Sequence, residues 1–124
     1  MNLVDSSGWI EYFSGGPLAD RYSTYLEKKS QLLVPTLVIY EVYRWIKRHE
    51  GEEEALKYTA QMSEGTVVPL DDSLALLAAD LSLTHHLAMA DSIVYGTAIV
   101  HQAKLITSDA DFQDLPSVTF LAKK

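Results

Sequence analysis

The chain has 124 residues, a length that fits one domain, and 48% of them are hydrophobic, which is enough to form a core. It has no cysteine, which excludes a disulfide scaffold, a thiolate zinc site and a cysteine nucleophile. Its net charge of −7 disfavours nonspecific binding to nucleic acid, because phosphate contacts need Lys and Arg, unless carboxylates hold divalent cations. No apolar run approaches the about 20 residues of a membrane span and no signal peptide is visible, so we expect a cytoplasmic protein without a membrane partner.

The first half of the chain reads as two strands and two helices. A short buried strand at residues 2–4 is followed by a helix from Ser6, which Gly15-Gly16-Pro17 ends. Apolar positions at helical spacing predict a second helix over about residues 18–26. A second strand is predicted at residues 31–34, stopped by Pro35.

The second half continues the alternation. Thr36 is expected to cap a helix to about His49, and the glutamates from Glu50 onward begin another. The remaining expected elements are strands at 66–69, 104–107 and 118–120 and helices at 73–83 and 90–102. Short apolar strands that alternate with helices predict an α/β fold. We therefore expect one domain over residues 1–124, a three-layer α/β/α sandwich with a central parallel five-stranded sheet.

Four carboxylates map to one edge of that sheet. Asp5 directly follows the first strand and Asp109 follows the fourth. Glu41 lies about two turns into the helix that leaves the second strand, and Asp91 opens the helix before the fourth. Sites in open parallel sheets form outside the carboxyl ends of the strands. We therefore expect these four side chains to converge.

Glu41 and Asp91 each interrupt an otherwise apolar segment, so their side chains should face a partly buried space. Burial of a lone carboxylate is costly unless it is paired, hydrogen-bonded or bound to metal. Hard cations such as Mg²⁺ and Mn²⁺ take oxygen ligands, activate water and stabilise phosphoryl displacement. A converging carboxylate cluster therefore favours a Mg²⁺ or Mn²⁺ site.

Each carboxylate also has a structural explanation. Asp5 and Asp91 are both placed to cap helices, and Asp109 is placed for a turn or a cap. Glu41 is in mid-helix, where its structural role would be an ion pair, for example with Arg44. Four such roles meeting at one sheet edge would be four separate coincidences.

Four segments resemble the motifs of the PIN-domain family, in the same order. They are Val4-Asp5-Ser6-Ser7, Pro35-Thr36-Leu37-Val38-Ile39-Tyr40-Glu41-Val42, Ala90-Asp91-Ser92-Ile93-Val94-Tyr95-Gly96-Thr97-Ala98 and Leu105-Ile106-Thr107-Ser108-Asp109-Ala110-Asp111-Phe112. Length and motif order resemble the VapC toxins of prokaryotic toxin–antitoxin pairs, and the resemblance covers essentially the whole chain.

The resemblance implies a parallel five-stranded sheet and a Mg²⁺- or Mn²⁺-dependent endoribonuclease that a cognate antitoxin holds in check. Carried onto this sequence, it makes Asp5, Glu41, Asp91 and Asp109 the catalytic and metal-binding quartet. Ser6 and Thr107 match polar positions that support the site. Asp111 either assists the metal or caps the turn through Phe112.

Three further features bear on partners and alternatives. Arg44, Lys47 and Arg48 share one helix face, where they either contact RNA phosphates or form an ordinary solvated face. Seven Tyr and two Trp in a short chain, together with the resemblance, favour a homodimer. A receiver-like phosphoacceptor domain is disfavoured because no strand carries the required Asp and Lys. A non-catalytic PIN-shaped binding module is the remaining alternative.

Overall fold

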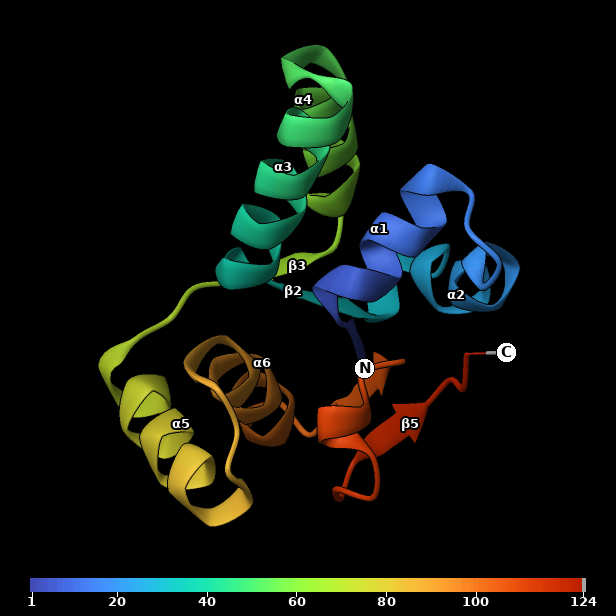
Figure 1. Cartoon of the computed structure of the whole chain (residues 1–124). Coiled ribbons are helices and arrows are strands. Elements are labelled where there is room, and N and C mark those ends of the chain that lie inside the picture. Colours follow the sequence, from blue (N-terminus) through green and yellow to red (C-terminus); the bar gives the residue numbers. More distant parts are fainter. Residues whose placement is uncertain (124) are drawn as a thin grey trace.

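The computed structural model describes residues 1–123, and its five strands form one parallel sheet in the order β3-β2-β1-β4-β5 (Figure 1). The strands are β1 (Asn2–Val4), β2 (Leu32–Pro35), β3 (Thr66–Val68), β4 (Lys104–Thr107) and β5 (Val118–Phe120). Leu3 of the central strand pairs with Leu33 on one side and Leu105 on the other. The predicted central parallel five-stranded sheet is confirmed.

Six α-helices and two 3₁₀ turns connect the strands. They are α1 (Ser6–Ser14), α2 (Ala19–Leu26), η1 (Lys29–Gln31), α3 (Thr36–Glu50), α4 (Glu52–Met62), α5 (Asp72–His85), α6 (Met89–Val100) and η2 (Ala110–Phe112). Right-handed crossovers are the rule for parallel strands, and the chain reverses direction across the sheet between β3 and β4. Figure 1 accordingly shows α3 with α4 and α5 with α6 on different sides of the strands, which confirms the predicted layered α/β fold. Within residues 1–123 no helix is both long and apolar enough to cross a membrane.

Two local expectations around the second strand are wrong. Pro35 does not stop β2 but is its last residue, paired in register with Val68. The sheet tolerates proline here because no backbone N–H hydrogen bond is needed from the final position of the strand. Thr36 is not a cap either. It is the first residue of α3, and Pro35 occupies the N-cap position without a side-chain hydrogen bond. The fixed φ of proline, −62° here, suits the entry into a helix.

The core lies between the sheet and the helices, and it explains why the strands are short apolar runs. All four residues of β2 are buried, as are Leu3 and Val4 of β1 and the last three residues of β4. A sheet that is covered on both faces buries both sides of each strand, so the strands lack an alternating pattern. Polar groups are consequently confined to the ends of the strands, where the chain turns into a helix.

Candidate active site

β1 is the central strand of the sheet, with β2 on one side and β4 on the other. The strand order changes direction at β1, which makes this strand a topological switch point. Loops after neighbouring strands separate at such a switch point and leave room for a site. Asp5 follows β1 and Asp109 follows β4. Glu41 comes from α3, after β2, and Asp91 is the third residue of α6. The electrostatic coupling among these acids, described below, shows that they lie near one another.

Asp5 is fixed in place by hydrogen bonds from its surroundings, and it is only 6% exposed. Its Oδ1 accepts from the backbone N–H of Ser6 over 2.8 Å, which makes Asp5 the N-cap of α1. Its Oδ2 accepts from the Thr107 hydroxyl over 3.1 Å and, more weakly, from the Ser7 hydroxyl over 3.4 Å. The side chain of Asp5 therefore caps α1 and also contacts the neighbouring strand end that leads to Asp109.

Thr107 links the ends of β1 and β4. Its hydroxyl donates to Asp5 and accepts from the backbone N–H of Asp109 over 3.0 Å. The Asp109 Oδ1 in turn accepts from the backbone N–H of Asp111 over 2.9 Å and caps η2. Because Thr107 is fully buried, its hydrogen bond to Asp5 is shielded from competing water, whereas the bond between Asp111 and Asp109 is exposed.

Three carboxylates are close enough to share a metal ion. Asp91, Asp109 and Asp111 each offer an oxygen, and these oxygens lie within 4.8 Å of one another. Asp5 and Glu41 are not members of this group, so it differs from the quartet expected from sequence. Asp5 has its oxygens turned toward Ser6, Ser7 and Thr107. Asp111, left open between two roles, belongs to the group, and the cap of η2 is Asp109.

The acids raise one another's pKa values. The pKa of Asp91 is raised from 3.8 to about 6, first by desolvation and then by the charges of Asp5, Asp109, Asp111 and Glu41. Burial raises the pKa of Asp5 as well, against the lowering effect of its hydrogen bonds from Ser6 and Thr107. The pKa of Glu41 is raised by burial and by Asp5, with partial relief from the Ser6 side chain. The like charges of this region are therefore left uncompensated by protein cations.

Two of the purely structural explanations fail. Asp91 does not cap α6, because Ala88 holds the N-cap position and Asp91 lies inside the first turn. Glu41 has no ion pair with Arg44. The ion pairs among residues 1–123 are Lys29 with Glu64 and Lys47 with Glu52. Neither carboxylate has a cationic partner among residues 1–123 that explains its position in an apolar segment.

A buried polar pair beneath the site was not expected from sequence. The hydroxyls of Tyr22 and Ser108 lie 2.6 Å apart, and both residues are buried. Tyr22 was interpreted only as an apolar position of its helix, since an amphipathic pattern does not separate Tyr from Leu. A buried Tyr hydroxyl needs a partner, and Ser108 next to Asp109 supplies it. The pair ties α2 to the loop that carries Asp109.

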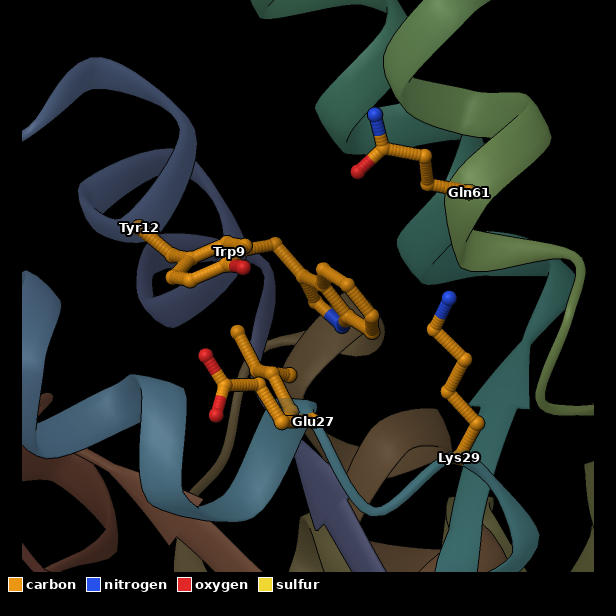
Figure 2. A pocket seen from close by; sticks show the side chains of 6 residues that line it. Trp9, Tyr12, Glu27, Lys29 and Gln61 are labelled. Atoms are coloured by element: carbon orange, nitrogen blue, oxygen red, sulfur yellow. The ribbon is translucent and has the colours of Figure 1, made fainter.

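The basic residues Arg44, Lys47 and Arg48 line a shallow hollow of about 420 Å³ on α3, together with Tyr40 and Tyr43. A separate cavity of about 270 Å³ lies between α1, the end of α2 and α4 (Figure 2). Figure 2 shows Trp9 of α1 beside Lys29 and Gln61 in that cavity. None of the acidic residues of the sheet edge lines it.

Comparisons with known proteins agree with this architecture. A family model described as the PIN domain matches residues 3–118. No curated protein sequence matches the chain.

Among solved structures, the chain is similar to a toxin–antitoxin complex from Klebsiella pneumoniae, with a TM-score of 0.82, 23% identity and 96% of each chain covered. It is also similar to VapBC2 from Rickettsia felis bound to a promoter DNA fragment, with a TM-score of 0.77, 15% identity and coverage of 98% of this chain and 97% of that one. A third similar structure is VapC20 from Mycobacterium tuberculosis, described as a toxin that cleaves the sarcin-ricin loop. Its TM-score is 0.74, with 16% identity and coverage of 90% of this chain and 92% of that one.

The likeness to these structures, at such identities, is a likeness of fold. The family model covers nearly all of the sequence, including the segments that carry Asp5, Glu41, Asp91 and Asp109. The chain belongs to the PIN domain family.

Proposed function

We propose that this chain is a metal-dependent endoribonuclease that acts as the toxin of a type II toxin–antitoxin pair. The observation that carries the proposal is the gathering of uncompensated acids at the β1/β4 switch point, where Asp91, Asp109 and Asp111 offer oxygens within 4.8 Å of one another. Desolvation, and then the charges of the neighbouring acids, raise the pKa of Asp91 to about 6. Membership in the PIN domain family supports a nuclease over other uses of such a site.

The donor set fits a hard divalent cation. Its three side chains offer oxygen only, the ligand type of Mg²⁺ and Mn²⁺, and the chain has no cysteine to favour a softer metal. Asp91 and Asp109 are half-buried while Asp111 is exposed, so the group opens to solvent on one side. A site that is open on one side leaves room for water and for a phosphate oxygen.

The residues divide into those that hold the metal and those that organise it. Asp91, Asp109 and Asp111 are the ligands that we assign, and Asp5, fixed by Thr107 and Ser6, adds negative charge behind them. When bound, Mg²⁺ or Mn²⁺ acidifies water and neutralises charge on the scissile phosphate.

Glu41 is the residue that we assign to the attacking water. Burial and Asp5 raise the pKa of Glu41, which makes its carboxylate a better proton acceptor. Asp5, which the sequence analysis placed among the direct ligands, contributes negative charge behind the three ligands in this scheme.

The proposed partners are RNA as substrate and a cognate antitoxin protein, in the cytoplasm. Support for an antitoxin comes from similar folds that were solved as toxin–antitoxin complexes. Arg44 and Arg48 are exposed on the same helix as Glu41, and we assign them to phosphates of the substrate. Lys47 is a weaker candidate because its ammonium already contacts Glu52 over 3.3 Å.

A homodimer is also part of the proposal, on different grounds from those of the sequence. Aromatic residues such as Trp9, Tyr22 and Tyr95 are buried, and apart from Tyr40 the large exposed hydrophobic residues of the described chain are Leu, Val and Met. Leu76 and Leu83 of α5 and Met89 of α6 are 72%, 78% and 77% exposed. They lie beside a hollow of about 580 Å³ whose lining includes alanines. A second copy presents the same projections and hollow, so a two-fold contact is self-complementary.

Cleavage of RNA by the purified chain tests the proposal. We expect cleavage with Mg²⁺ or Mn²⁺, none in EDTA, and a loss of at least about 100-fold in Asp91→Asn, since asparagine keeps the shape but loses the charge. Asp80→Asn is the matched control, an exposed aspartate on α5. A chain that binds RNA but never cleaves it, with any of these metals, would instead be a non-catalytic PIN-shaped binding module.

A further inference from the structure

One face of α3 combines an exposed and a half-buried tyrosine with basic side chains. Tyr40, Tyr43, Arg44, Lys47 and Arg48 lie at positions i, i+3, i+4, i+7 and i+8 of α3 and line a single hollow of about 420 Å³. The opposite face of the same helix consists of Val38, Val42 and Ile46, which are fully buried. Packing therefore explains the buried face of α3 and, through Tyr43, part of the hollow, but it does not explain Tyr40 or the basic side chains.

Tyr40 is the least explained residue of this face. It is 62% exposed, the only aromatic side chain among the large exposed hydrophobic residues of the described chain. No ring stacks on it within residues 1–123, whereas Trp9 and Tyr58 each stack on Phe13. Tyr40 directly precedes Glu41 in α3, so the two residues belong to the same turn, with their side chains about 100° apart around the helix axis.

The charges of the face are not equivalent. Lys47 contacts Glu52 over 3.3 Å and lies 5.6 Å from the centre of the Tyr43 ring, so its ammonium is already engaged. Arg44 and Arg48 are exposed and take part in no ion pair among residues 1–123. Two free guanidinium groups beside an open tyrosine ring are unusual on a chain whose net charge is −7.

This combination matches the chemistry of an unpaired nucleotide. Single-stranded nucleic acid is bound by aromatic rings that stack on bases and by cations that follow the phosphates. Tyr40 and Arg48 are eight residues apart, about 12 Å along the helix axis, which leaves room for a base and its neighbouring phosphates. A duplex, in contrast, keeps its bases stacked inside and offers no face to a tyrosine.

We propose that Tyr40 stacks on an unpaired RNA base next to the cleaved bond, while Arg44 and Arg48 hold the adjoining phosphates. This inference rests on the proposed function and names the residues of α3 that hold its substrate. Tyr40 is then a residue that sets where the strand lies relative to Glu41, and Tyr43 forms the side wall of the hollow.

The test measures binding of a short unstructured RNA that contains the fluorescent base 2-aminopurine, in the Asp91→Asn background so that binding is separated from cleavage. We expect Tyr40→Ala to weaken binding about 5- to 30-fold, in the lower half of the range for one stacked base, and to abolish quenching of the fluorescent base. Tyr40→Phe keeps the ring and should bind within about twofold of its parent. Leu76→Ala, which removes another exposed large side chain, is the control.

Salt dependence separates stacking from charge. Tyr40→Ala should leave the slope of log affinity against log salt unchanged, whereas Arg44→Ala and Arg48→Ala should each reduce it by about 0.7. Arg21→Ala, an exposed arginine on α2, should not change the slope.

The outcomes distinguish this inference from the proposed function. RNA affinity of Tyr40→Ala equal to that of Leu76→Ala overturns the inference, while wild-type chain that still cleaves RNA keeps the nuclease intact. Loss of a protein partner in Tyr40→Ala, with RNA binding unchanged, overturns it as well and makes the face a protein contact. Wild-type chain that neither cleaves nor binds RNA removes the proposed function itself.

Discussion

Replacing Asp91 with asparagine should inactivate the protein and stabilise its metal-free fold at the same time. The pKa of Asp91 is raised from 3.8 to about 6, chiefly by desolvation and then by four neighbouring acids. Its carboxylate accepts no side-chain or capping hydrogen bond among residues 1–123 that asparagine would lose. The native state therefore carries a charge at Asp91 that the unfolded chain carries more easily.

The size of the effect follows from the shift. A rise of about two pH units corresponds to about 3 kcal/mol, and solvent screening of this half-exposed group reduces it to about 1–2 kcal/mol. The N-terminal end of α6 favours the charge by about 0.5 kcal/mol. A net gain of about 1 kcal/mol remains for Asp91→Asn, and at about 2.1 cal/mol/K per residue this raises the melting temperature by about 4 °C.

The sign with pH is fixed by the direction of the shift. A raised folded-state pKa means that the native state retains a proton which the unfolded chain releases. The penalty is absent below the unfolded pKa of 3.8, grows as pH rises, and is complete above about 6. In EDTA, wild type and Asp91→Asn should therefore melt together at pH 3.5 and diverge by pH 7.5, with the mutant higher.

Thermal melts followed by circular dichroism measure this directly, with Asp80→Asn as a control that should stay within about 0.5 kcal/mol of wild type. Added Mn²⁺ should reverse the order, because metal at 100 times its dissociation constant stabilises the wild type by about 2.7 kcal/mol and the mutant far less. An Asp91→Asn protein that melts below wild type in EDTA at pH 7.5, with no response to Mn²⁺ in either, refutes the reasoning.

Three other changes have clear expected results. Thr107→Val removes the hydroxyl between Asp5 and Asp109 and should cost about 1–3 kcal/mol in melts and lower the cleavage rate. Asp111→Asn should weaken Mn²⁺ binding in calorimetry while leaving the melting temperature in EDTA nearly unchanged, since Asp111 is exposed; an unchanged affinity would exclude it as a ligand. Leu83→Glu should leave only the 13.8 kDa monomer in light scattering, whereas a dimer that persists would exclude the α5 face as its contact.

Much of the fold could be predicted because its signals are local. Short apolar runs between helical patterns indicate a parallel sheet covered on both faces, and the sheet of the structure is of that kind. The ends of the helices and strands were harder to predict. Pro35 is both the last residue of β2 and the N-cap of α3, because proline lacks a backbone N–H and neither position requires one.

The approximate location of the site was also readable, because Asp5 and Asp109 each follow a strand. Of the three carboxylates that meet within 4.8 Å, Asp91 and Asp109 were predicted as site residues and Asp111 was left open between two roles. The sequence did not show which acids would turn toward one another, since orientation depends on tertiary hydrogen bonds. Thr107 and Ser6 hold the Asp5 oxygens, and the turn at η2 brings Asp111 to Asp109. The Tyr22–Ser108 hydrogen bond could not be predicted either, because the two residues are 86 positions apart in the sequence and meet only in the folded structure.

The most direct test follows Mn²⁺ binding and RNA cleavage in one titration, with free Mn²⁺ measured by electron paramagnetic resonance. If the acids at the β1/β4 switch point form a catalytic metal site, cleavage should rise in proportion to bound Mn²⁺. Both should be lost in Asp91→Asn and kept in Asp80→Asn. RNA cleavage that continues in EDTA, or wild-type protein that binds no Mn²⁺ at millimolar concentrations, would contradict it.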